Sequence, residues 1–253
     1  QDAAGQGKKG SGSEPAGCIV RFDGMFSRRE VQSKKRSAVC FIFRPFSIHP
    51  DPESLIIGDA EKYGRIFFKA DTFTINKDWA IDLCDKIINS PLYGKISFTV
   101  NSRSNTLSNV LCAKLKQAGC FMLAVGFESG SDETLKKIKK GATVSDSINA
   151  VKTAKETGLP VFGFFMIGFP WETEEDIKQT LNFALSLGLE YAEIHIAMPY
   201  YGTGLYKMCE EYGTLNNSSY GFDVVNPNTK GTAYVSMERI NQLKRRFLIK
   251  FYL

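Results

Sequence analysis

The sequence predicts a parallel α/β fold, in which strands and helices alternate along the chain. Five apolar runs have the length of buried strands, and their starts lie roughly 25 to 40 residues apart, about one strand-plus-helix unit. Amphipathic segments with helix start and stop signals separate them. Strands connected in this way run parallel and are joined by right-handed crossovers. The five runs are residues 65–68, 96–100, 121–127, 161–167 and 191–197.

Each intervening helix is predicted from the residue that precedes it. Asn76, Ser108 and Ser131 are N-cap residues placed before amphipathic segments. Two more helices begin with a pattern typical of capping boxes, in which a threonine is followed three residues later by an aspartate. A glycine just past the last apolar position ends several of these helices. The boxes are Thr143 with Asp146 and Thr173 with Asp176, and the stop glycines are Gly119, Gly158 and Gly188.

Composition indicates a globular domain with a sizeable core. Of the 253 residues, 43% are hydrophobic and 23% are charged. The net charge of +5 is too small an excess over this length to indicate a nucleic-acid partner. The longest apolar stretch has about ten residues, too few to span a bilayer, and the polar N-terminus lacks the apolar segment of a signal peptide. We therefore expect a cytoplasmic protein without a membrane span or a nucleic-acid partner.

Three segments are expected along the chain. Residues 1–45 are rich in Gly, Ser, Lys and Arg and are predicted to form a flexible arm, with a nucleic-acid-binding arm as the alternative. Residues 46–206 hold the strand and helix units and form the core. Residues 207–253 are an extension that consists of a polar loop and a basic amphipathic helix. The chain starts with Gln1 and stops directly after that helix, so we expect both ends to continue in a longer protein.

Polar residues follow three successive strand runs. In a parallel α/β fold, the ligand site lies at the carboxyl ends of the strands. Asp71 follows the first run, Arg103 the second and Glu128 the third. Together they suit a zwitterionic ligand with hydroxyl groups. Arg103 would clamp a carboxylate, Asp71 would face an ammonium group, and Glu128 would accept hydrogen bonds from a ribose diol.

Each of these three residues also has a purely structural interpretation. Glu128 would cap the helix that begins near Ser131, Arg103 would pair with Asp71, and Asp71 would start a turn. The architecture is open as well, between a doubly wound sheet and a (β/α) barrel. The first run is not followed by G-x-G-x-x-G, and polar residues at successive strand ends are what a barrel site requires, so we favour the barrel.

One histidine lies within the fifth run. His195 alternates there with Ile194 and Ile196. We interpret it as a packed core histidine rather than as a catalytic group, and we interpret Phe165 and Met166 as packing residues.

The six cysteines form no local metal-binding motif. Cys112 and Cys120 are the nearest pair in sequence, and no C-x-x-C or C-x-x-x-C occurs. A disulfide framework is not expected in a chain of this length without an export signal. The sequence therefore assigns no metal ligands.

Several segments, taken together, resemble the radical S-adenosylmethionine (radical SAM) enzymes. The motif ESGS-x-x-x-L-x-x-x-x-KG begins at Glu128, and GFFMIGFPWET begins at Gly163. The resemblance extends over roughly residues 54–206. It is strongest to the group whose members often carry an upstream cobalamin-binding domain, with proteins like the anaerobic magnesium-protoporphyrin ester cyclase among them.

The resemblance implies a partial (β/α)6 barrel of TIM type and an enzyme that binds S-adenosylmethionine (SAM). Such enzymes cleave SAM reductively to a 5′-deoxyadenosyl radical that acts on a small-molecule substrate, with an electron donor such as flavodoxin or ferredoxin. The methionine part of SAM would lie near Asp71 and Arg103, the ribose near Glu128, and the adenine near the backbone of residues 167–170. The implied cofactor-binding residues are Asp71, Thr72, Asn101, Arg103, Glu128, Ser129, Ile167, Gly168 and Pro170.

The sequence departs from the family pattern at the iron–sulfur cluster. The family binds a [4Fe-4S] cluster through C-x-x-x-C-x-x-C ahead of the first strand, and this chain has only Cys18 and Cys40 there, 22 positions apart. We expect a radical SAM core whose cluster loop is truncated, out of frame or lost, with cobalamin bound, if at all, by an upstream domain. The alternative is a non-catalytic SAM- or nucleotide-binding barrel.

Overall fold

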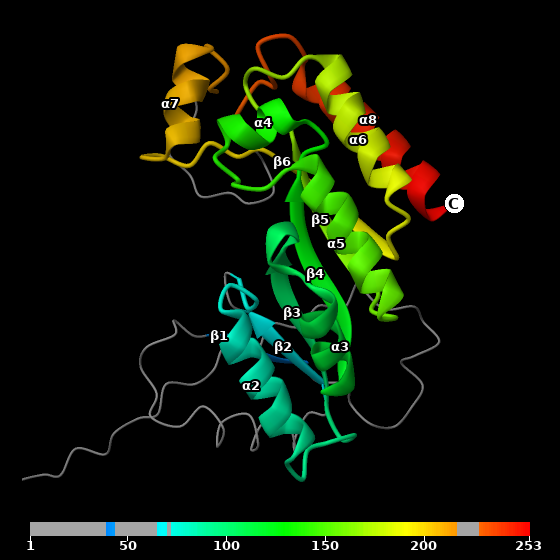
Figure 1. Ribbon diagram of the computed structural model, residues 1–253. Coiled ribbons are helices and arrows are strands. Elements are labelled where there is room, and N and C mark those ends of the chain that lie inside the picture. The colour runs from blue at the N-terminus through cyan, green and yellow to red at the C-terminus, as the bar shows by residue number, and fades with distance from the viewer. Residues whose placement is uncertain (1–38, 44–64, 70–71, 217–227) are drawn as a thin grey trace, which may run out of the picture.

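The computed structural model describes residues 39–43, 65–69, 72–216 and 228–253, and a single parallel sheet forms their centre (Figure 1). The sheet has six strands in the order β1-β2-β3-β4-β5-β6, and all neighbouring pairs are parallel. The strands are β1 (Val39–Phe43), β2 (Arg65–Lys69), β3 (Ser97–Arg103), β4 (Cys120–Glu128), β5 (Val161–Ile167) and β6 (Tyr191–Ile196).

The strand order distinguishes between the doubly wound sheet and the (β/α) barrel, the two architectures that the sequence left open. A doubly wound sheet reverses its strand order at a switch point, whereas in a (β/α) barrel each strand lies beside the next one in the chain. Here the spatial order equals the chain order throughout. The fold is therefore a parallel α/β sheet wound in one direction, a partial (β/α)6 barrel, as expected.

Helices follow the strands, and their first residues are the predicted caps. The Asn76 side chain accepts a hydrogen bond from the backbone of Trp79 at 3.0 Å, and both predicted capping boxes are formed. The helical segments are α2 (Lys77–Ile88), the short 3-10 helix η1 (Ser104–Thr106), α3 (Asn109–Gln117), α4 (Asp132–Lys137), α5 (Val144–Glu156), α6 (Glu174–Ser186), α7 (Gly204–Glu211) and α8 (Met237–Tyr252). Within the described residues, no helix combines the length and the apolar character needed to cross a bilayer.

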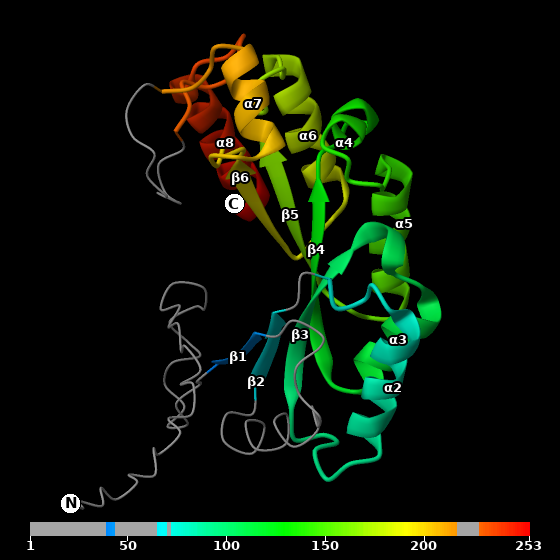
Figure 2. The ribbon, with the colours of Figure 1, turned by 90° about the vertical axis from the view of Figure 1, so that its left-hand side faces the viewer.

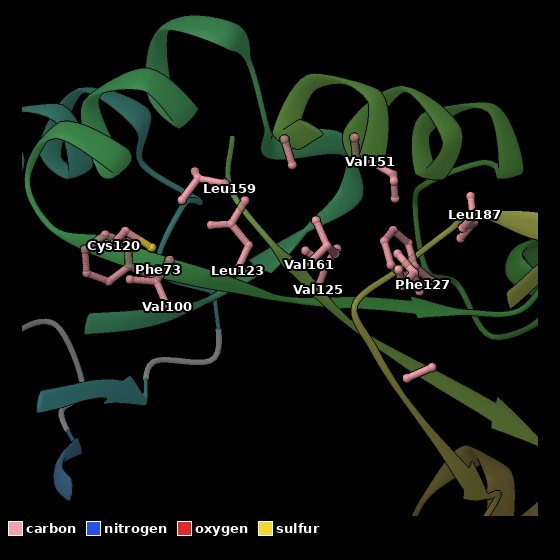
Figure 3. Close-up of a cluster of buried hydrophobic side chains, with 14 of the residues drawn as sticks. Phe73, Val100, Cys120, Leu123, Val125, Phe127, Val151, Leu159, Val161 and Leu187 are labelled. Atoms are coloured by element: carbon pink, nitrogen blue, oxygen red, sulfur yellow. The ribbon is translucent and has the colours of Figure 1, made fainter. Parts of the chain in front are cut away.

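The hydrophobic core lies between the sheet and these helices. Figure 2 shows α2, α3 and α5 on one side of the sheet. Every second residue of a strand points to that side, which is why Leu123, Val125 and Phe127 of β4 are buried together. Val161 of β5 and Val151 of α5 join the same cluster (Figure 3). The core therefore occupies one face of the sheet.

Several boundaries differ from the sequence prediction. β3 extends to Arg103 and β4 to Glu128, so each of these residues ends its strand instead of following it. β1 lies inside the range 1–45 that the sequence predicts to be a flexible arm, and for residues 39–43 that prediction is wrong. Those apolar residues gain ladder hydrogen bonds from β2, a tertiary contact that local composition does not reveal. The other residues of that range lie outside the described part of the chain.

The C-terminal extension packs on the barrel. Arg239 of α8 donates two hydrogen bonds to the Glu174 carboxylate of α6, from Nε at 2.8 Å and from Nη2 at 2.6 Å. At the other end of α8, the Tyr252 hydroxyl donates to the backbone oxygen of Ala192 at 2.8 Å and accepts from its N–H at 3.1 Å. The last helix thus joins α6 to β6.

Candidate functional site

Several predicted site residues lie on the sheet face opposite the helix-packed core. In a parallel sheet, residues in register on neighbouring strands point to the same side. Arg103 is in register with Gly126, which is in register with Phe164. Asn101 lies two residues before Arg103 and therefore faces the same way. The structure thus brings the ends of β3, β4 and β5 together around Gly126, which has no side chain.

Glu128 occupies a β-bulge at the end of β4. The register of β4 against β5 shifts between Gly126 and Glu128, and Glu128 has a φ of 68°, which only a few per cent of non-glycine residues adopt. Its side chain returns over Gly126, because a Cβ added there would lie 2.8 Å from Glu128 Oε1 and 3.1 Å from Lys140 Nζ. Lys140 donates to Oε1 at 2.8 Å. Within the described residues, Oε2 accepts no hydrogen bond.

Arg103 lies beside the same turn that supplies Lys140. A Cβ added at Gly141 would lie 3.5 Å from its Nη2, and Asn105 donates to the Gly141 oxygen at 2.7 Å. Thr106 Oγ1 donates to the Arg103 oxygen at 2.8 Å. The lysine–glycine end of the first family-like motif therefore contacts the ends of both β3 and β4.

A buried cluster of hydroxyl groups fixes the end of β3. Thr74 Oγ1 lies 2.6 Å from Ser102 Oγ and 2.5 Å from Thr106 Oγ1. The backbone N–H of Phe73 donates to the Asn101 oxygen at 2.9 Å. These bonds attach the loop after β2, which contains Thr72, to β3. Asp71, the remaining predicted residue of that loop, lies outside the described residues.

Ser129 is fully buried, and its side chain bonds within the protein. Ser129 Oγ lies 3.0 Å from Thr180 Oγ1 of α6 and accepts from the Ser131 N–H at 3.1 Å. The hydroxyl joins β4 to α6, so the role of Ser129 in this structure is to hold these two elements together.

The predicted adenine loop, residues 167–170, is organised by a carboxylate that the sequence reasoning missed. Glu172 Oε2 accepts from the N–H of Gly168 at 2.7 Å and of Phe169 at 3.0 Å. Glu172 is 0% exposed, and its Oε1 has no hydrogen-bond partner in the described part of the chain. Burial raises the pKa of Glu172 from 4.5 to about 7. In the sequence, the feature that could have indicated this role is the position of Glu172, an acidic residue between the apolar strand and the capping box.

Other backbone groups of this loop are also bonded within the chain. The Ile167 oxygen accepts from the N–H of Ala197 at 2.8 Å, and the Pro170 oxygen accepts from the N–H of Ala233 at 2.9 Å. Gly168 has a φ of 83°, a conformation that L side chains rarely adopt. The loop is therefore buried and held by hydrogen bonds within the chain.

The described residues do not fit an iron–sulfur cluster. Cys84, Cys112 and Cys120 are buried on the helix side of the sheet, and burial raises their pKa values to about 12, 11 and 12. Cys209 is buried as well. No group of three or more His, Cys, Asp or Glu side chains that could hold a metal occurs among the described residues. Cys18 lies outside that part of the chain.

His195 is not the packed core residue that its position in the sequence indicated. Its side chain is 48% exposed, and its Nε2 lies 3.6 Å from Glu193 Oε1. Ile194, on the opposite face of β6, is 1% exposed. The residues of β6 alternate between two faces as expected, but the core lies on the face of Ile194.

Comparisons with known proteins point to one family. The family model described as the radical SAM superfamily matches residues 53–184. An uncharacterized methyltransferase of Pyrococcus horikoshii is 38% identical over 239 residues, which cover 92% of this chain and 49% of the relative. The anaerobic magnesium-protoporphyrin IX monomethyl ester cyclase of Cereibacter sphaeroides is 24% identical, over 70% of this chain and 30% of the cyclase.

A solved structure of similar fold is the radical SAM methyltransferase TsrM from Kitasatospora setae, determined with cobalamin and a [4Fe-4S] cluster bound. It superposes with a TM-score of 0.55 at 18% identity and covers 65% of this chain and 31% of that one. This likeness concerns the fold. The chain spans about half the length of the Pyrococcus relative and less of the others.

Proposed function

Because the chain belongs to the radical SAM superfamily of enzymes, we propose that its strand-end site on β3, β4 and β5 binds SAM. We further propose that the longer protein uses SAM in a methyl-transfer reaction on a small-molecule substrate. The name of the Pyrococcus relative, a methyltransferase, supports the second step. Family membership favours this enzyme over the non-catalytic barrel kept open by the sequence.

The observation that carries the SAM site is the Glu128–Lys140 pair over Gly126, beside Arg103. A guanidinium group can hold the methionine carboxylate through two parallel hydrogen bonds. Lys140 fixes one oxygen of Glu128, which leaves the other oxygen for the ribose hydroxyls. Gly126 removes the side chain that would otherwise stand under the ligand.

The remaining predicted residues shape the site. Thr72 and Asn101 lie at the joined ends of β2 and β3, where the amino group of methionine would be bound, with Asp71 as a further proposed contact. The loop 167–170, held by Glu172, would lie beside the adenine. Ser129 would act by holding β4 to α6.

The cluster and cobalamin belong to the proposal for the longer protein. The described residues do not fit a [4Fe-4S] cluster. We infer that its ligands and any cobalamin contact come from other parts of the longer protein, and that a separate electron donor such as flavodoxin or ferredoxin reduces it. The chain's own role is to bind and orient SAM.

The test is calorimetric titration of SAM into the 253-residue chain. Arg103→Ala and Glu128→Ala are each expected to weaken binding by about 1–3 kcal/mol, the cost of losing a charge-assisted hydrogen bond. Arg245→Ala, which removes an exposed charge from α8, is the matched control and should leave the affinity unchanged. Equal affinities of the wild type and both site variants would overturn the proposed site.

A further inference from the structure

The face of β5 and β6 that points away from the core carries an aromatic strip. Along β5, Phe162 and Phe164 alternate with the buried residues of the core. Their ring centroids lie 4.4 Å apart. The Phe162 ring lies 6.2 Å from that of Tyr191, and the Phe164 ring lies 6.0 Å from the His195 imidazole. The strip is therefore continuous from Tyr191 to His195.

Two polar side chains border this strip on β6. Glu193 is in register with Phe164, so the two side chains leave the sheet on the same face from neighbouring strands. Glu193 Oε1 lies 3.6 Å from His195 Nε2, and these side chains are 42% and 48% exposed. Tyr191 is 51% exposed. An exposed aromatic surface beside a carboxylate–imidazole pair has the composition of a ligand-binding surface rather than of a core.

The strip shares its face with the proposed SAM site but lies beyond it. One row across the sheet runs from Arg103 through Gly126 and Phe164 to Glu193. Strands lie about 4.8 Å apart, so the backbone of Glu193 is about 14 Å from that of Arg103. SAM held at the ends of β3, β4 and β5 would thus have the β6 part of the strip at its side, where a second ligand can lie against it.

We propose that Phe164, Glu193 and His195 form a subsite for a planar aromatic ring that carries a ring N–H and belongs to the substrate. The proposal rests on the proposed function, because it places a second ligand beside SAM. The ring stacks on Phe164. An ionised carboxylate only accepts hydrogen bonds, so Glu193 selects a ring with an N–H donor, and His195 orients that carboxylate.

The first experiment uses the imidazole NMR signals of the 253-residue chain. The chain has two histidines, so His195→Asn identifies the His195 signal by its loss. Indole is the probe, and 1-methylindole is the same ring without the donor. Indole is expected to shift the His195 signal and to bind about tenfold more tightly than 1-methylindole, the effect of one hydrogen bond to a charged group. An unchanged His195 signal would overturn the proposal.

Variants separate stacking from hydrogen bonding. Glu193→Gln should reduce the preference for indole over 1-methylindole, whereas Phe164→Leu should weaken both ligands alike. Tyr93→Leu, at an exposed aromatic residue outside the strip, is the matched control and should change neither. A preference that Glu193→Gln leaves intact would contradict the assigned role of the carboxylate.

A further titration separates this proposal from the SAM site. Glu193→Gln is expected to leave SAM affinity unchanged, while Arg103→Ala lowers it. If adenosine shifts His195 as indole does and SAM displaces indole, the strip holds the adenine of SAM, and the substrate subsite is refuted. If the wild-type chain does not bind SAM at all, the proposed function is refuted instead.

Discussion

The buried carboxyl group of Glu172 is hydrogen-bonded to the loop after β5. Its protonation should be measurable as a change in the free energy of unfolding with pH. Its Oε2 accepts two backbone hydrogen bonds and its Oε1 accepts none, so the ionised form is only half compensated for burial. Glu172→Gln keeps the shape and the acceptor oxygen and removes the titration. The comparison of wild type and variant therefore isolates this one group.

The sign and size follow from the two pKa values. Glu172 titrates near 4.5 when exposed in the unfolded chain and near 7 when folded. Between these values the native state binds more protons, so its stability is full below about pH 4.5 and falls as pH rises towards 7. Each pKa unit corresponds to about 1.4 kcal/mol, which gives a loss of about 3 kcal/mol. The glutamine variant lacks this loss.

The assay is urea unfolding followed by circular dichroism at about pH 5 and about pH 8, where the two-state free energies are compared. The wild type minus variant difference should decrease by about 2–3 kcal/mol between the two conditions, because part of the loss has already occurred at about pH 5. Glu175→Gln, at a side chain 81% exposed in the first turn of α6, is the control and should show little change. A difference for Glu172→Gln that is the same at both pH values would refute the reasoning.

Three further substitutions test other contacts. Gly126→Ala places a methyl group 2.8 Å from Glu128 Oε1, so SAM affinity measured by calorimetry should fall by about 1–2 kcal/mol; unchanged affinity would separate Gly126 from the site. Thr106→Val removes a buried donor from the end of β3 and should cost about 1–3 kcal/mol in urea unfolding. Tyr252→Phe removes both bonds to Ala192 and should cost about 1–2 kcal/mol, and an unchanged midpoint would count against them.

The local structure was predictable where it depends on neighbours in sequence. The capping boxes at Thr143 and Thr173 and the strand 161–167 form as expected, because their signals lie within a few residues. The bulge at Glu128 and the burial of Glu172 were not predictable in this way. Both depend on contacts between elements. Glu128 bonds to Lys140, twelve residues downstream, and Glu172 is buried by the packing of the loop between β5 and α6.

The exposure of His195 shows a second limit. Period-2 alternation indicates that two faces of a strand differ, but it does not say which face meets the core. The sequence around Ile194 and His195 does not show which of the two points toward the core. That depends on which side of the sheet the helices cover. Of the residues proposed for the substrate ring, His195 was therefore assigned to packing by sequence, whereas the structure leaves its side chain 48% exposed.

The Tyr252 hydroxyl has a consequence for association between molecules. The outward backbone groups of an edge strand can pair with a strand of another chain, and covering them is one way in which proteins prevent aggregation. Tyr252 occupies the N–H and the carbonyl oxygen of Ala192 on the outer edge of β6. The Tyr252 side chain thereby blocks the addition of a strand from another molecule at this position. Fraying of α8 would free these backbone groups for intermolecular pairing.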